Sequence, residues 1–210
     1  RMVHGEITGW YVTFVNPGKP IPEDVAHLTN ISDEDVANAP DPNTAVAGLV
    51  EFVGSSDVVA HNANFDRTFC TKYPTGEVLK RNYWIDSLDL AKIALPRLTS
   101  HRLLDLVRAF GGPDSTHRAD DDVAATCLVY RVLLAAVDNM PTPLLQHIAD
   151  MCDTDTWNTE RVFKCFAAMK ASEGPYNLRA SRKAAVAQAS APLRPDANVP
   201  DVSPAGEKLP

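Results

Sequence analysis

The sequence lacks a strong basic charge, paired cysteines and a long apolar run. Its net charge is −7 over 210 residues, so no overall positive field attracts a phosphate backbone. No C-x-x-C pair occurs among its four cysteines (Cys70, Cys127, Cys152 and Cys165), which indicates reduced thiols in a cytoplasmic protein. No apolar run approaches the roughly 18 residues of a membrane span, and the first residues lack the apolar stretch of a signal peptide, so we expect no membrane association.

Composition and hydrophobic spacing predict an α/β fold. Hydrophobic residues make up 45% of the chain, enough for a substantial core and too much for a disordered protein. Alternating residues predict a hairpin that turns at His4–Glu6 and continues as a strand to Val15, and short buried strands follow at Asp57–Ala60 and Tyr83–Asp86. Helices are expected in the remaining apolar stretches, at 21–29, 32–36, 43–53, 67–72, 87–95, 102–110 and 123–137. Strands alternating with helices indicate three layers around a mixed sheet.

The composition changes twice after this region. Met140–Pro143 is typical of a linker and is followed by two expected helices at 144–151 and 159–170. From about Glu173 the residues are mainly Ala, Pro, Ser, Arg and Asp, which is typical of an extended or disordered tail. We therefore divide the chain into a first domain, a linker with a helical extension, and a tail, at 1–139, 140–172 and 173–210.

The stretch His117–Asp122 places a histidine and three acidic residues before an apolar helix. Carboxylates in a first helical turn suit the positive end of the helix dipole, so an acidic helix start with His117 in a loop is one interpretation. The other is a chemical site, in which Asp122 is a ligand of a hard metal ion and His117 is a titratable base beside it. These residues alone do not decide between the two.

A second acidic position follows the strand at Asp57–Ala60. The segment His61–Asp66 leaves the carboxyl end of that strand, where open α/β sheets place their ligands. Asp66 could contribute to a site there, or could simply occupy the first turn of a helix. Asp86 is expected to be structural, and His101 is expected to lie on the surface.

Together, the ordered segments resemble the DnaQ-like 3′–5′ exonucleases, the DEDDh branch of the RNase H-like superfamily. Phe14–Pro22 and His27–Asp33 look like the region after the first hairpin of that family. His61–Asp66 is similar to its second motif and His117–Asp122 to its third. The resemblance covers residues 2 to about 137 and implies an RNase H-like three-layer fold with a central mixed sheet, here without its N-terminal strand.

The resemblance also implies a chemistry. The family hydrolyses phosphodiesters at DNA 3′ ends with two divalent ions, Mg²⁺ or Mn²⁺, for which carboxylates are suitable ligands. By the resemblance, Asp66 and Asp122 are metal ligands. Asp121 is the alternative to Asp122, and only the spacing of the family motif favours Asp122. His117 is the general base, because a histidine that titrates near physiological pH can take a proton from the attacking water.

Three further residues are assigned to the substrate by the same resemblance. Asn62 would hydrogen-bond the terminal nucleotide and Phe65 would pack against it, although Phe65 could also be a core residue. His61 belongs to the same segment, and its ring is better suited to bracing the turn. The expected partner is a single-stranded or frayed DNA 3′ end, held by aromatic stacking and metal–phosphate contacts.

The sequence departs from the family in its first motif. That motif, an Asp-x-Glu on the first strand, precedes the hairpin and supplies half of the family's acidic residues, whereas this sequence starts inside the hairpin. Asp33–Asp35 opens a helix and does not replace it. We therefore expect an N-terminally truncated domain with an incomplete site, nearly inactive on its own.

The region after residue 139 indicates two contexts. An exonuclease domain followed by a proline linker and helices resembles the exonuclease fused to DinG-type helicases, and also the proofreading epsilon subunit of DNA polymerase III with its polymerase-binding tail. The chain contains no Walker A loop that would decide for a helicase. Two alternatives to a DNA exonuclease stay open: a catalytically inactive docking module of such a helicase or polymerase, and an exoribonuclease acting on short RNA.

Overall fold

The computed structural model describes residues 1–112, 119–151 and 158–172. His117, Cys152 and the expected tail at 173–210 lie outside these ranges. The elements follow one another in the order β1 (Met2–Val3), β2 (Glu6–Ile7), α1 (Glu23–Thr29), α2 (Asp33–Val36), α3 (Pro42–Val53), β3 (Val58–Ala60), α4 (Ala63–Thr71), the 3₁₀ helix η1 (Pro74–Arg81), β4 (Trp84–Asp86), α5 (Ser87–Ala94), α6 (Leu103–Ala109), α7 (Ala119–Asp138), α8 (Thr142–Met151) and α9 (Glu160–Ser172).

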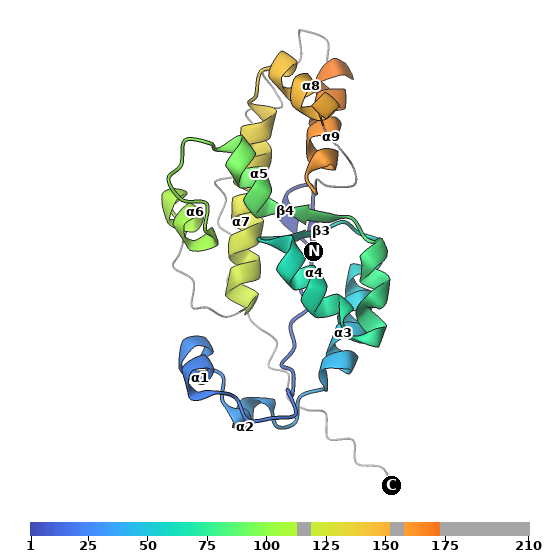
Figure 1. Ribbon diagram of the computed structural model, residues 1–210, viewed down its shortest axis with the longest axis vertical. Coiled ribbons are helices and arrows are strands. Elements are labelled where there is room, and N and C mark those ends of the chain that lie inside the picture. The colour runs from blue at the N-terminus through green and yellow to red at the C-terminus, as the bar shows by residue number, and fades with distance from the viewer. Residues whose placement is uncertain (113–118, 152–157, 173–210) are drawn as a thin grey trace.

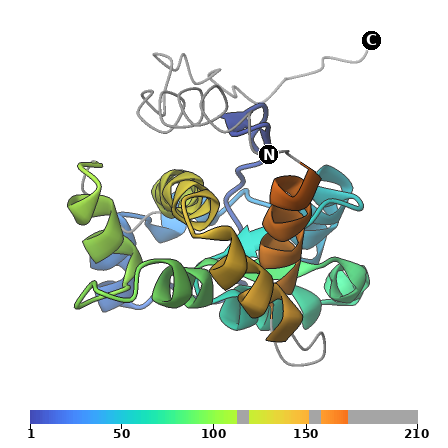
Figure 2. The same cartoon turned by 90° about the horizontal axis from the view of Figure 1, so that it is seen from above.

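Helix α7 runs along the length of the molecule (Figure 1). Helices α8 and α9 lie at one end of it, α1 and α2 lie at the opposite end, and the pair of strands β3 and β4 lies near its middle. Seen from above, α7 and α9 stand side by side (Figure 2), and the two helices contact each other.

Strands β3 and β4 pair in parallel, with Val58 opposite Trp84 and Ala60 opposite Asp86. A parallel pair needs a long crossover connection, which α4 and η1 supply here. All three residues of β4 are buried, and β3 contacts α4, α5 and α7. The carboxyl ends of both strands therefore open onto the same edge of the pair.

One apolar cluster joins the helices from α5 to α9. Its fully buried side chains come from each of these helices in turn: Leu90, Leu106, Leu133, Leu145 and Phe163. The boundary that we predict at residue 139 remains a prediction, and it falls between helices that share this core.

Local signals in the sequence fix several helix ends. Asp41 caps α3 by accepting hydrogen bonds from the N–H groups of Asn43 (2.9 Å) and Thr44 (3.2 Å). Ser32 and Asp35 form a capping box at the start of α2, where the sequence predicts a helix start. Asn30 ends α1 in a left-handed conformation with φ of 53°, which asparagine tolerates. These three helices confirm the predicted positions.

The hairpin at the start of the chain is confirmed, but its extension is wrong. His4 and Gly5 connect β1 and β2, both at positive φ (50° and 83°), as a two-residue hairpin turn requires. No strand lies between Ile7 and Val58, in a part of the chain that the structure describes throughout. The alternating pattern up to Val15 is therefore not sufficient, because a strand also needs a neighbour for its backbone hydrogen bonds.

The segment after β2 packs on α3 instead. The Tyr11 hydroxyl donates a hydrogen bond to the carbonyl of Ala45 at 2.8 Å, and its ring stacks on Phe52 with 6.0 Å between centroids. As a result, the central mixed sheet that we predict is replaced, among the described residues, by two separate two-stranded sheets. One is the antiparallel hairpin and the other is the parallel pair.

Helix α9 begins beside the amino ends of β3 and β4. The Arg161 guanidinium pairs with the Asp57 carboxylate at 2.8 Å and lies over the Tyr83 ring, 4.2 Å from its centroid. The Arg161 N–H also donates to the Tyr83 hydroxyl at 3.3 Å. Since Asp57 and Tyr83 immediately precede β3 and β4, one residue of α9 contacts the chain at the start of both strands.

The longest described helix, α7, spans 20 residues and buries Leu128, Val129 and Leu133 in the core. Within the ranges that the structure describes, no single helix is long and apolar enough to cross a membrane. Helices α7 and α8 meet the criteria of length and composition only as a pair, bent by 112° between them.

Candidate active site at the carboxyl ends of β3 and β4

Asp86 connects the starts of two helices. It is the buried last residue of β4 and the N-cap of α5, where its carboxylate accepts a hydrogen bond from the N–H of Leu88 at 2.9 Å. The same carboxylate accepts hydrogen bonds from the N–H groups of Asn62 (3.2 Å) and Ala63 (3.0 Å) at the start of α4. One side chain thus satisfies three N–H groups that helix starts leave without helical partners. This is the structural role that we predict for Asp86.

His61 follows β3 directly and braces two other segments. Its Nδ1 lies 3.0 Å from Ser87 Oγ, and its Nε2 lies 2.9 Å from the carbonyl oxygen of His101. Because a carbonyl only accepts, Nε2 carries a proton and donates it to His101. The Ser87 hydroxyl also donates to the carbonyl of Ala60 at 3.2 Å, so Ser87 connects His61 to the end of β3. Burial lowers the pKa of His61, while the hydrogen bond to His101 and the charge of Asp86 oppose that shift. Both ring nitrogens are engaged within the protein, so the place of His61 among the substrate-binding residues remains a prediction.

Asn62 opens α4 in a left-handed conformation, with φ of 72° and ψ of 57°. Few residues other than glycine tolerate these angles, and asparagine is one of them. Asparagine at an N-cap usually bonds to the backbone of its own helix, but the Asn62 side chain makes no such bond and is exposed. Its amide therefore faces solvent at the edge where the two strands end, and this exposure supports the predicted contact with a nucleotide.

Asp66 lies in the first turn of α4 and is partly buried. Burial raises the pKa of this carboxyl above its usual range and the nearby charge of Asp86 raises it further, although a backbone hydrogen bond acts in the opposite direction. The charged form of Asp66 is therefore disfavoured. A bound divalent cation would reverse that balance, because positive charge favours the carboxylate.

Phe65 is a surface residue. Its side chain is 69% exposed, which excludes the alternative that it belongs to the core. The backbone N–H of Phe65 donates to the carbonyl of Asn62 at 3.0 Å, in the turn that opens α4. The ring is thus exposed to solvent. In the sequence it lies between Asn62 and Asp66, a position that suits the packing contact with a nucleotide that we predict.

The third motif is described only in part. Asp122 lies in the first turn of α7, as predicted, whereas His117 lies outside the described residues. Carboxylate oxygens such as those of Asp66 and Asp122 suit Mg²⁺ or Mn²⁺. However, the described residues contain no group of three or more His, Cys, Asp or Glu side chains placed to hold a metal ion. The donor type fits the predicted ions, but the described part of the chain does not gather a complete set of ligands.

Two residues of the arrangement were not predicted to take part in it. The surface position predicted for His101 is wrong: the residue is partly buried, its Nε2 lies 3.0 Å from the Leu95 carbonyl, and its own carbonyl meets His61. Ser87 is buried and contacts the same histidine. The Asp86–Ser87 pair, an N-cap pattern after a buried strand, could have indicated one of these contacts. The contact between His61 and His101 spans 40 residues and has no local signal.

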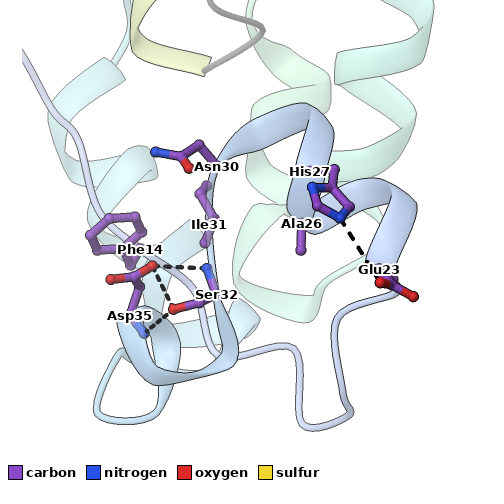
Figure 3. A pocket seen from close by; sticks show the side chains of 8 residues that line it. All are labelled: Phe14, Glu23, Ala26, His27, Asn30, Ile31, Ser32 and Asp35. Atoms are coloured by element: carbon purple, nitrogen blue, oxygen red, sulfur yellow. Dashed lines mark hydrogen bonds and ion pairs between the residues drawn. The ribbon is translucent and has the colours of Figure 1, made fainter.

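A separate concavity of roughly 520 Å³ lies between Phe14 and helices α1 and α2 (Figure 3). Four of its polar side chains are already engaged with one another in two pairs. Glu23 lies 3.9 Å from His27, and Ser32 bonds to Asp35 within the capping box. None of the predicted site residues lines this concavity, so we assign the candidate chemistry to the ends of β3 and β4 instead.

Comparison with known proteins places these residues in a family. The exonuclease family model RNase_T matches residues 1–130, a range that includes Asp66 and Asp122. The chain is 30% identical over 186 residues to a PolC-type DNA polymerase III of Halalkalibacterium halodurans, covering 85% of this chain and 13% of that protein. It is 32% identical over 150 residues to the 3′–5′ exonuclease DinG of Bacillus subtilis, covering 69% of this chain and 16% of that protein.

The chain thus spans less than a fifth of the length of these two relatives. Among solved structures, exonuclease X in complex with 5′ overhanging duplex DNA matches 62% of this chain and 76% of its own, with 23% identity and a TM-score of 0.47. The family model covers more than half of the chain, including both predicted acidic positions. The chain therefore belongs to the RNase_T exonuclease family.

Proposed function

We propose that this chain is a metal-dependent exonuclease domain that removes nucleotides from the 3′ ends of single-stranded or frayed DNA. The observation that carries the proposal is the grouping at the start of α4, where the carboxyl of Asp66 has a raised pKa and follows an exposed amide and an exposed ring. This group lies at the carboxyl end of a parallel pair of strands, where α/β sheets bind ligands.

In this proposal each residue has a distinct role. The Phe65 ring packs against the terminal base, and the Asn62 amide hydrogen-bonds the terminal nucleotide. Asp66 and Asp122 would hold Mg²⁺ or Mn²⁺, which would neutralise charge at the phosphoryl oxygens and lower the pKa of a bound water. His117 accepts a proton from the attacking water. His61, neutral and hydrogen-bonded on both sides, keeps the segment that carries Asn62 in place.

A second candidate is a docking module that kept the fold and lost the chemistry. It is favoured by one observation, the lack of a group of three metal-ligand side chains among the described residues. For the same reason we propose that the activity of this chain alone is low. The relatives named above are a polymerase and a DinG exonuclease, so we propose that the domain works beside a polymerase or a helicase.

The test is digestion of matched DNA and RNA oligonucleotides that carry a label at the 5′ end. A 3′–5′ exonuclease shortens the strand stepwise while the label stays on every product, and EDTA stops the reaction. We expect slow shortening of DNA that depends on Mg²⁺ or Mn²⁺. The Asp66→Asn variant should lose this activity. The control variant Asp89→Asn, at a residue of an exposed ion pair, should retain it. Faster shortening of RNA would establish the exoribonuclease instead. Binding of DNA with no shortening at any metal concentration would favour the docking module.

A further inference from the structure

Helix α4 carries two exposed aromatic rings on one side, and a lysine and a partly exposed tyrosine follow its last residue. Phe65 and Phe69, one turn apart, are 69% and 51% exposed. The Lys72 Nζ lies 4.1 Å from the centroid of the Phe69 ring and 4.9 Å from that of Tyr73. The Phe69 and Tyr73 rings meet edge to face, with 5.9 Å between centroids and an interplanar angle of 73°. We call these four residues the α4 aromatic face.

The opposite side of the same helix does the packing. Ala63 is buried with Leu79 and Trp84, and Cys70 packs against this cluster. Helical spacing separates Ala63 and Cys70 from Phe65 and Phe69 by roughly a third of a turn or more. The fold of the described residues therefore does not use the α4 aromatic face for its own core.

The charge around this face differs from that of the rest of the chain. The segment Ala63–Arg81 has four basic residues against two acidic ones, in a chain of net charge −7. Two of the basic residues, Lys80 and Arg81, lie at the end of η1, which contacts α4, and Arg67 donates to the Lys80 carbonyl at 3.4 Å. The segment is therefore basic overall in an acidic chain, although Lys80 is paired with Glu77 at 3.0 Å, and Lys72 is the cation that lies over the rings.

Rings with interleaved cations are the chemistry that binds single-stranded nucleic acid. Bases stack on aromatic side chains, and a lysine beside them contacts the backbone phosphates. Phe69 follows Phe65 by one helical turn, about 6 Å along the axis, so the row leads away from the candidate site in steps. Helix α4 itself leads away from the carboxyl end of β3 (Figure 1).

We propose that the α4 aromatic face binds the DNA strand behind its 3′-terminal nucleotide, with bases on Phe69 and Tyr73 and a phosphate on Lys72. This inference rests on the proposed function, which places the terminal nucleotide at Phe65. The inference adds a binding track, the α4 aromatic face, whose length sets how many nucleotides of single-stranded DNA the domain binds.

The test measures binding by fluorescence anisotropy, in EDTA and again with Ca²⁺, so that it does not depend on hydrolysis. One probe is a single-stranded octathymidylate. The other is thymidine monophosphate, whose affinity is measured by its competition with a labelled strand. We expect Phe69→Ala and Lys72→Ala each to weaken the octanucleotide by about 10-fold and to leave the mononucleotide unchanged. Lys72→Ala should also reduce the slope of log affinity against log salt by about 0.7, and Lys72→Arg should restore it.

Matched controls are Met169→Ala, a 46% exposed residue on α9, and Lys92→Ala, an exposed lysine on α5. Neither should change binding, and all variants should unfold at the temperature of the unchanged chain. If Phe69→Ala and Lys72→Ala bind the octanucleotide like the unchanged chain, the track is overturned while the proposed function stands. If the unchanged chain binds neither probe, the proposed function fails and the track fails with it.

Discussion

The carboxylate of Asp86 accepts a hydrogen bond from the backbone N–H of Ala63 at 3.0 Å, although 23 residues separate the two along the chain. This contact fixes the start of α4, and with it Asn62 and Asp66, to the end of β4. The geometry of the candidate site therefore depends on a residue that performs none of its proposed chemistry.

Replacing Asp86 by alanine should destabilise the protein by about 2–4 kcal/mol, because three backbone N–H groups at two helix starts lose their acceptor at a buried position. Urea unfolding measures the change. Asp89→Ala is the matched control, since that carboxylate forms an exposed pair with Lys92 at 3.0 Å and should contribute less than about 1 kcal/mol. Equal losses for the two variants would contradict the proposed link between the helix starts.

The charged carboxylate of Asp66 should lower the stability of the folded protein and should be necessary for metal binding. Burial raises the pKa of this carboxyl in the folded state, so the folded state holds its proton to higher pH than the unfolded state. Stability is therefore lost as pH rises from the unfolded pKa through the raised folded pKa. At neutral pH we expect Asp66→Asn to raise Tm by on the order of 2 °C. Mg²⁺ should raise the Tm of the unchanged chain and leave that of Asp66→Asn unaltered.

His61 should make the protein sensitive to mild acid. Burial lowers its pKa below the usual 6.5, so the unfolded state binds the proton more readily than the folded state. Stability from the neutral ring is present above about pH 6.5 and is lost as pH falls from there through the lowered folded pKa. His61→Gln should be less stable by about 1–2 kcal/mol at pH 7.5 and should lose less on acidification. Unfolding at a series of pH values, with the exposed His27→Gln as control, tests this expectation.

Asn62 allows backbone and side-chain effects to be separated. Its φ of 72° suits glycine, so Asn62→Gly should keep stability within about 0.5 kcal/mol, whereas Asn62→Ala should cost about 1 kcal/mol. Both variants lose the amide and should bind a mononucleotide about 10-fold more weakly if it contacts the substrate. Calorimetry of stability and of nucleotide binding distinguishes the two effects. A glycine variant that binds normally would remove Asn62 from the site.

His117→Ala should lower turnover by about 10²- to 10⁴-fold and leave the fold intact, because a general base acts on the rate of the chemical step. The measurement is the steady-state rate of shortening of a 5′-labelled DNA strand under the conditions in which the unchanged chain is active. An unaltered rate would exclude His117 from the mechanism.

Much of the fold follows from local patterns. The capping box at Ser32, the N-cap at Asp41 and the left-handed Asn30 are each encoded within a few residues, and the predicted helix positions there are confirmed. The predicted strand up to Val15 failed because strand formation depends on a distant partner that the alternating pattern does not specify. The 3₁₀ helix η1 was not predicted, since it is short and begins with Pro74 and Gly76, residues that are common in turns.

In the candidate site, too, some features follow from the local sequence and others do not. Asn62 and Asp66 could be placed from sequence because they directly follow a buried strand whose carboxyl end is a common ligand position. The contacts that hold them, from Asp86 to α4 and from His61 to His101, join segments 23 to 40 residues apart. Such contacts depend on how the elements pack, which no local pattern contains.

The two strands behind the site are only three residues long, and they are anchored at both ends. Arg161 contacts Asp57 and Tyr83 at their amino ends, and Asp86 binds the start of α4 at the opposite end. The same short pair of strands therefore links the start of α9, through Arg161, to the start of α4, through Asp86.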